Sequence, residues 1–156
     1  MRIVIVAIGR AKPGPARSIY EEYRERLKPP PELIELEERR PLPAAELKRR
    51  EGELILAALA RRPGRARITV ALDEAGRNLA TLAFAKMLGD WRTRGIEEAA
   101  FLIGGADGLD QPVKQAADLI LSLGPMTWPH LLVRGLLAEQ LYRAQQIAAG
   151  HPYHRG

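Results

Sequence analysis

The chain has 156 residues, of which 46% are hydrophobic, so it is long enough for one sizeable core and predicts a single domain over residues 1–156. It contains no cysteine, which excludes disulfides, thiolate metal sites and cysteine nucleophiles and fits a reducing compartment. Its formal net charge of +5, carried mostly by arginine, favours nucleic acid as a partner, although a solvated basic surface has the same composition.

The first half of the chain predicts two strand–helix units. Residues 2–8 (RIVIVAI) form a near-continuous apolar run, which is typical of a parallel strand covered on both faces. A loop at 9–15 leads to an amphipathic helix that ends at the prolines 29–31. Residues 32–37 (ELIELE) alternate as a half-buried strand does, and residues 44–61 predict a second helix.

The second half continues the alternation. Three further runs predict strands: 66–72, 99–103 and 119–123. We expect a helix from an N-cap at Asn78 to Trp91, and a short helix after Pro112. Strands that alternate with helices in this way predict an α/β fold with a mainly parallel sheet flanked by helices.

The last predicted helix, residues 131–149, is apolar over more than a single core-facing stripe. Such a helix needs two apolar neighbours. We expect the sheet on one side and a second copy of the protein on the other, which makes the protein a homodimer. A helix sunk deep in the core of a monomer is the alternative.

No apolar run approaches the length of a membrane span, and the apolar segment at the N-terminus is shorter than the core of a signal peptide. The sequence therefore predicts a cytoplasmic protein with no membrane contact.

Three loops, residues 72–76, 104–108 and 123–130, follow the three C-terminal strands. In open α/β sheets this edge is where ligands bind. The glycine pair Gly104–Gly105 lets a ligand approach the backbone, although such a pair also occurs in ordinary turns and matches neither a dinucleotide fingerprint nor a Walker A loop. The prediction of a pocket therefore depends on all three loops together.

The chain ends in GHPYHRG, which holds two of its three histidines. Histidine, tyrosine and arginine suit general acid–base chemistry on an anionic substrate, while a solvated basic tail is the alternative. A zinc site would have only His130 besides these histidines and would need carboxylates to complete it. We expect no metal.

Four segments, in this order and with this spacing, resemble the ribosomal RNA large subunit methyltransferase H family of the SPOUT superfamily: LIGGADG (102–108), SLGPMTWPHLLVR (122–134), AEQLYRA (138–144) and HPYHR (151–155). The first strand and EGELILAAL (51–59) also match in place, so the resemblance covers essentially the whole chain. It implies an S-adenosylmethionine-dependent enzyme that methylates N3 of a pseudouridine in helix 69 of 23S ribosomal RNA. It also implies a homodimer and a C-terminal trefoil knot, which patterns alone do not predict because knots are nearly absent from folds.

Carried over by position, the resemblance implies cofactor contacts from three loops: Leu72; Gly104 and Gly105; and Leu123, Gly124, Pro125, Met126, Thr127 and Trp128. The sequence departs from the family pattern at Ala106–Asp107, at Gly124–Pro125 and at Trp128. The last two change the side-chain wall of the pocket, and we expect the backbone contacts to persist.

Methylation at N3 requires the N3 proton to leave, so a base or an anion-stabilising group is needed. We hypothesise that His154 and Arg155 supply these functions, that Tyr153 positions the base, and that Arg134 holds phosphate or the developing negative charge. In a dimer, the tail of one subunit would reach the cofactor pocket of the other.

The lack of cysteine agrees with a nitrogen target, because carbon-5 methylation of a pyrimidine normally uses a cysteine nucleophile. With no added RNA-binding module, we expect the assembled ribosome rather than free RNA to be the substrate. Two alternatives stay open: a SPOUT enzyme that acts on another RNA such as tRNA, and a non-catalytic protein that binds an adenosine ligand or RNA.

Overall fold

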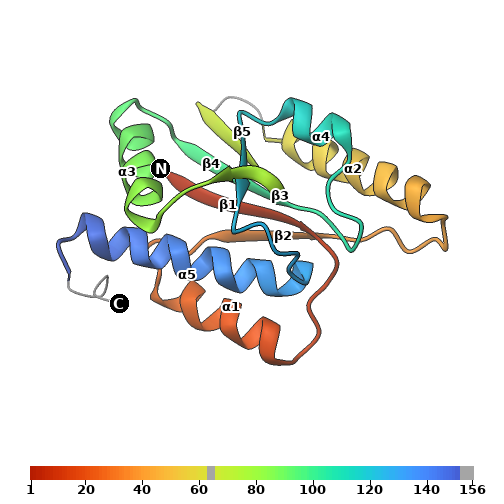
Figure 1. The fold of residues 1–156 in the computed structure, drawn as a ribbon, viewed down its shortest axis with the longest axis horizontal. Helices are drawn as coiled ribbons and strands as arrows, with labels where there is room; N and C mark the ends of the chain where they lie inside the picture. The colour runs from red at the N-terminus through yellow and green to blue at the C-terminus, as the bar shows by residue number, and fades with distance from the viewer. Residues whose placement is uncertain (63–65, 152–156) are drawn as a thin grey trace.

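The computed structural model describes residues 1–62 and 66–151, and a parallel sheet of five strands lies at its centre (Figure 1). The strands are β1 (Arg2–Ile8), β2 (Glu32–Leu36), β3 (Arg67–Asn78), β4 (Glu98–Ile103) and β5 (Leu119–Ser122). Their order in the sheet is β2-β1-β4-β3-β5, and every neighbouring pair is parallel. This confirms the predicted α/β class with a parallel sheet flanked by helices.

Five helices cover the two faces of the sheet: α1 (Pro15–Arg26), α2 (Ala44–Ala60), α3 (Thr81–Thr93), α4 (Gln111–Ala116) and α5 (His130–Ala148). Helices α1, α3 and α5 lie on one face, and α2 and α4 lie on the other (Figure 1). In β1, Ile5 and Ala7 pack on the first face, and Val4 and Val6 pack on the second. Because both faces are covered, the strand is an unbroken apolar run.

The end of β3 differs from the prediction. Asn78 is not a helix N-cap: it is the last residue of β3 and pairs with Ser122 of β5, and the N-cap of α3 is Ala80. The β3–β5 register shifts between Leu72 and Arg77, and β3 continues to Asn78, so the first loop predicted at residues 72–76 is instead an irregular part of this strand. Pairing with β5 therefore overrides the local capping preference of asparagine, as tertiary contacts often do.

Helix α5 packs between α1 and α3 above the sheet, where Leu137, Ala138 and Leu141 are buried. Gly135 lies against α1, because a Cβ atom at that position would come 2.7 Å from Ile19 Cγ2. The two helices thus supply apolar neighbours for much of the wide surface of α5. The homodimer, the trefoil knot and the single domain stay predictions.

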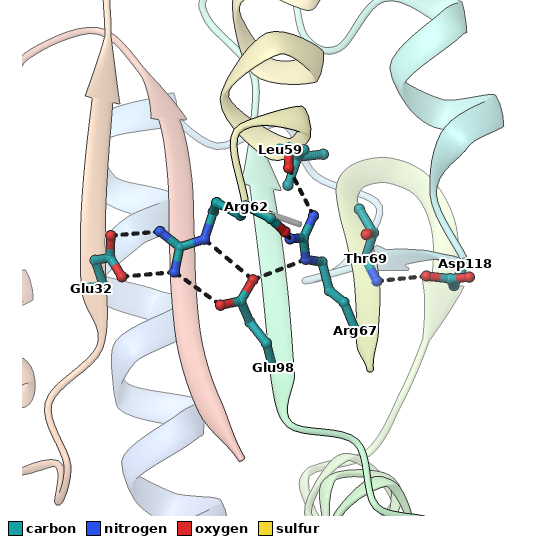
Figure 2. Close-up of polar contacts among 7 residues, drawn as sticks. All are labelled: Glu32, Leu59, Arg62, Arg67, Thr69, Glu98 and Asp118. Atoms are coloured by element: carbon teal, nitrogen blue, oxygen red, sulfur yellow. Dashed lines mark hydrogen bonds and ion pairs between the residues drawn. The ribbon is translucent and has the colours of Figure 1, made fainter. Parts of the chain in front are cut away.

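The amino-terminal edge of the sheet carries a buried polar network, which we call the amino-edge network (Figure 2). Glu98, at the start of β4, is 0% exposed and accepts hydrogen bonds from Arg62 Nη2 and Arg67 Nε, both at 2.9 Å. Arg62 also bonds both carboxylate oxygens of Glu32, at 2.8 and 2.9 Å. This network joins the end of α2 to the starts of β2, β3 and β4.

Among the described residues, no helix is both long enough and apolar enough to cross a membrane.

Candidate functional site

A cavity of about 430 Å³ lies at the carboxyl ends of β4 and β5, beside the irregular part of β3 at residues 72–75. All three predicted loops line it. Every predicted cofactor residue except Pro125 is part of its wall: Leu72, Gly104, Gly105, Leu123, Gly124, Met126, Thr127 and Trp128. The fold therefore brings together residues that are up to 56 positions apart in the chain, between Leu72 and Trp128.

The sequence predicts that Gly104 and Gly105 leave room for a ligand, but in the structure they leave room for other atoms of the protein. A Cβ atom at Gly104 would lie 2.5 Å from the carbonyl carbon of Gly108, and one at Gly105 would lie 2.7 Å from Glu51 Oε2. The loop folds back on itself, and the Gly108 N–H donates to the Gly105 carbonyl at 3.1 Å. The missing side chains leave room for the protein's own atoms, which shape this wall of the cavity.

Hydrogen bonds tie the third loop to the first. Thr127 Oγ1 donates to Glu74 Oε2 at 2.6 Å. Ser122 Oγ accepts the Gly124 N–H at 3.0 Å and lies 3.1 Å from the carbonyl oxygen of Glu74. These contacts hold the two loops as one wall, which favours a preformed binding site.

One side of the cavity carries an ion pair, Lys114 Nζ to Asp73 Oδ2 at 3.2 Å. Asp73 Oδ1 also accepts the Ala75 N–H at 2.9 Å. Burial alone would raise the pKa of Asp73, but the Ala75 N–H and Lys114 outweigh it and hold that pKa below its usual 3.8. This carboxylate is therefore charged at neutral pH.

Sequence reasoning missed Lys114 on α4 and Lys48 on α2, which both line the cavity. It also missed the buried Glu51 beside Gly105, whose pKa is raised by burial and by Asp107. Helices α2 and α4 lie on the same face of the sheet, and no local spacing of residues in the sequence predicts this. The nearest signal was that α4 follows directly on the second loop.

His130 begins α5 and lines the same cavity, although no role was predicted for it. A Cβ atom at Gly9 would lie 3.2 Å from His130 Nε2, so the ring packs against the loop after β1. Burial, followed by the charge of Arg134, holds the pKa of His130 below 6.5. The imidazole is therefore uncharged at neutral pH.

Arg134 lies one helical turn after His130 and is 1% exposed. Its Nη1 donates to Glu35 at 2.6 Å, and its Nη2 donates to the carbonyl oxygens of Ile8 at 2.9 Å and Gly9 at 2.6 Å. These contacts use much of the donor capacity of the guanidinium inside the chain. A contact of Arg134 with phosphate stays a prediction.

Three predicted catalytic residues, Tyr153, His154 and Arg155, lie outside the described residues, and their roles stay predictions. His151 is the last described residue, and its N–H donates to the Gln146 carbonyl at 2.9 Å. Residues 1–62 and 66–151 contain no group of three histidine or carboxylate side chains placed to hold a metal ion.

The comparisons with known proteins agree with this geometry. The family model described as "Predicted SPOUT methyltransferase" matches residues 1–154. Two relatives named ribosomal RNA large subunit methyltransferase H, from Rhodospirillum centenum and Paramagnetospirillum magneticum, are 59% and 56% identical to the chain over 155 residues. Each alignment covers 99% of both proteins.

Solved structures support the same fold. A probable methyltransferase from Bordetella pertussis Tohama I has a TM-score of 0.59 at 17% identity, with 92% of this chain and 95% of that chain covered. The SpoU methyltransferase AviRb from Streptomyces viridochromogenes, in complex with AdoMet, has a TM-score of 0.53 at 15% identity. It matches 94% of this chain, which spans 58% of AviRb. With a matching family model and near-full-length relatives above 50% identity, the chain belongs to the ribosomal RNA large subunit methyltransferase H family of SPOUT methyltransferases.

Proposed function

We propose that this protein uses S-adenosylmethionine to methylate N3 of a pseudouridine in helix 69 of 23S ribosomal RNA, on the assembled ribosome in the cytoplasm. The observation that carries the proposal is that one cavity is lined by all three predicted loops and by every predicted cofactor residue except Pro125. The names of the relatives support ribosomal RNA of the large subunit as the substrate class.

The residues of the cavity fit this cofactor. Its volume of about 430 Å³ is within the usual range for sites that bind small molecules. Leu72, Leu123 and Val133 offer apolar surface to an adenine ring, and the carboxylates of Asp73 and Glu74 offer negative charge to a sulfonium. When bound, the cofactor supplies a methyl group activated for displacement from sulfur.

The protein's own residues must deprotonate N3 and stabilise the charge that develops there. We assign charge stabilisation and positioning of the base to the tail residues Tyr153, His154 and Arg155. Arg134 is assigned to the same site, and its bonds to Ile8 and Gly9 favour a positioning role in the first instance.

We further propose that the protein acts as a homodimer and that its C-terminal half is knotted. A second cavity of about 530 Å³ lies between the start of α3 and the middle of α5. It borders the third loop, where Trp128 is part of its wall. Leu136, Glu139 and Gln140 of α5 line it, so a partner seated there would lie next to the cofactor cavity. This arrangement supports a site shared between two subunits.

Methyl transfer from labelled S-adenosylmethionine tests the proposal. Ribosomes that lack the modification are compared with modified ribosomes, with a free helix 69 hairpin and with tRNA, and the product is located by mass spectrometry. We expect one methyl on the helix 69 pseudouridine of unmodified ribosomes only. Transfer to tRNA would instead identify another SPOUT enzyme, and normal cofactor binding with no transfer would identify a non-catalytic protein.

A further inference from the structure

We infer that His130 is the group that accepts the N3 proton of the target base, an inference that rests on the proposed function. The sequence prediction placed proton handling only in the C-terminal tail. His130, by contrast, is the first residue of α5 and lines the cofactor cavity.

The position of His130 is suited to meeting both cofactor and base. Trp128 and Met126, two and four residues earlier, also line the cavity and are 41% and 69% exposed. An exposed indole ring offers a surface on which a flipped nucleobase stacks. Trp128 and His130 line the same cavity, so a base stacked on the indole would enter the space that the imidazole also borders.

The imidazole is held in place without using its nitrogens. Within residues 1–62 and 66–151 the ring makes no hydrogen bond or ion pair. Its two nitrogens are therefore not used by other groups in this part of the chain. Gly9 has φ +87° and leaves room for the ring. Its carbonyl accepts from Arg134, and Glu35 accepts from Arg134 and from the Ala11 N–H at 2.9 Å. The loop that supports the ring is thus fixed on two sides.

Burial, and after it the surrounding charges, keep the pKa of the ring low and the ring neutral. On its own helix, Arg134 and the positive end of the α5 dipole both disfavour the imidazolium. Glu35, a carboxylate on β2, is already paired with Arg134. Across the cavity, Asp73 is paired with Lys114 and Glu74 is bonded to Thr127, and Asp107 and Lys48 complete the ionisable groups of the wall. An uncharged imidazole is the form that can accept a proton.

The step balances in atoms and charge. The N3–H bond breaks and its proton moves to a ring nitrogen of His130. The N3 electron pair forms the bond to the methyl carbon, and the electron pair of the carbon–sulfur bond stays on sulfur. The positive charge of the sulfonium donor therefore ends as an imidazolium, which the nearby Arg134 helps to discharge to solvent.

The test is a pH profile of single-turnover methyl transfer to ribosomes at saturating cofactor, for the wild type, His130→Gln, His130→Asn and His154→Gln. We expect the His130 variants to transfer methyl about 100-fold or more slowly, in line with the loss of a general base. The low-pH limb of the profile should disappear in them and persist in His154→Gln. Added imidazole should restore part of the rate in His130→Gly.

Two measurements separate this role from binding or folding. Calorimetry with S-adenosylhomocysteine should give the His130 variants an affinity within about threefold of the wild type, which is less than 1 kcal/mol. NMR titration of the imidazole C–H signals should show one histidine with a pKa below 6.5 that is missing in His130→Gln and matches the kinetic limb.

Three results would overturn the inference. An unchanged rate and profile in His130→Gln, with the limb lost in His154→Gln, would move the base to the tail and leave the proposed function intact. Loss of cofactor binding in both His130 variants would make the residue a binding group. A wild type that binds cofactor but methylates no ribosomal RNA would defeat the proposed function, and the inference with it.

Discussion

The two edges of the sheet use ionisable side chains in opposite ways. At the amino-terminal edge, Glu98 is fully buried and both of its oxygens are bonded by arginines, as Figure 2 shows. At the carboxyl-terminal edge, His130, Trp128 and Met126 line a cavity with polar or apolar surface still open. Buried charges with complete partners hold elements together, whereas groups without partners are available to a ligand.

The comparison is not simply one of position. Arg134 lies at the carboxyl-terminal edge, yet its side chain is only 1% exposed, against 16% for Arg62 and Arg67. Its two terminal nitrogens bond Glu35, Ile8 and Gly9, while its buried Nε has no hydrogen-bond partner among the described residues. The difference between the edges therefore depends on whether the donors and acceptors of a side chain are satisfied within the chain. Four predictions test this difference.

The largest expected effect on stability is from Glu98→Ala. It leaves Arg62 and Arg67 partly buried without their shared carboxylate. Breaking a buried pair in this way costs about 3–5 kcal/mol. We expect a loss of about 3 kcal/mol in the free energy of unfolding by urea, at fixed protein concentration. Glu32→Ala, at the exposed end of the network, should cost less than about 1 kcal/mol. Equal losses in the two variants would mean that burial of the carboxylate does not determine how much each ion pair stabilises the protein.

At the same edge, the contribution of Glu98 to the free energy of unfolding should depend on pH. Burial alone would raise the pKa of Glu98, but Arg62 and Arg67 outweigh it and hold that pKa below 4.5. A folded-state pKa below the unfolded value contributes stability above pH 4.5, which is lost as pH falls through the lower, folded value.

Glu98→Gln is the probe for this effect, since the amide does not titrate. At pH 7 it should be about 2 kcal/mol less stable than the wild type, because charged hydrogen bonds are lost. Urea titrations between pH 7 and pH 3 should show this gap closing below pH 4.5. A gap that stays constant across that range would show that Glu98 is not the titrating group.

At the other edge, Gly104→Ala should act on binding. The added Cβ would lie 2.5 Å from backbone of the same loop, so the loop must move. We expect the affinity for S-adenosylmethionine, measured by calorimetry, to fall more than about tenfold, which is about 1.4 kcal/mol. The control is Gly89→Ala in α3, where nothing lies within 4 Å of a Cβ atom. It should leave affinity unchanged and add about 0.5–1 kcal/mol to stability.

The smallest effect is expected from Asp73→Asn, which removes the partner of Lys114 and a negative charge from the cavity. We expect cofactor affinity to fall about fivefold, or about 1 kcal/mol. Asp90→Asn breaks the exposed pair with Lys86, far from the cavity wall, and serves as the matched control with no change in affinity. A similar loss in both variants would point to overall charge instead of the site.

The sequence predicted the elements well where the local pattern and the tertiary environment agree. The strand at 2–8 and the helix at 44–61 match β1 and α2 within one residue. Prediction was wrong at Asn78, because the capping preference of asparagine is local and weak while β3–β5 pairing is not visible in the sequence.

The same limit explains the site. The three loops were predicted because each follows a strand, and parallel strands end at a common edge. Lys48 and Glu51 were not assigned to the pocket, since their places depend on how α2 crosses the sheet. His130 ends the predicted third loop but was given no role, because its packing depends on the distant loop at Gly9.

The amino-acid sequence by itself thus determined the α/β class, the edge at which the cavity lies and the family of the protein. Each depends on short-range periodicity or on ordered motifs that are readable along the chain. Only the tertiary structure decided which charges are satisfied. Arg134 is buried and bonded to β1 and β2, about 100 residues or more away in sequence. His130 has an uncharged imidazole because such long-range contacts set its burial and place Arg134 beside it.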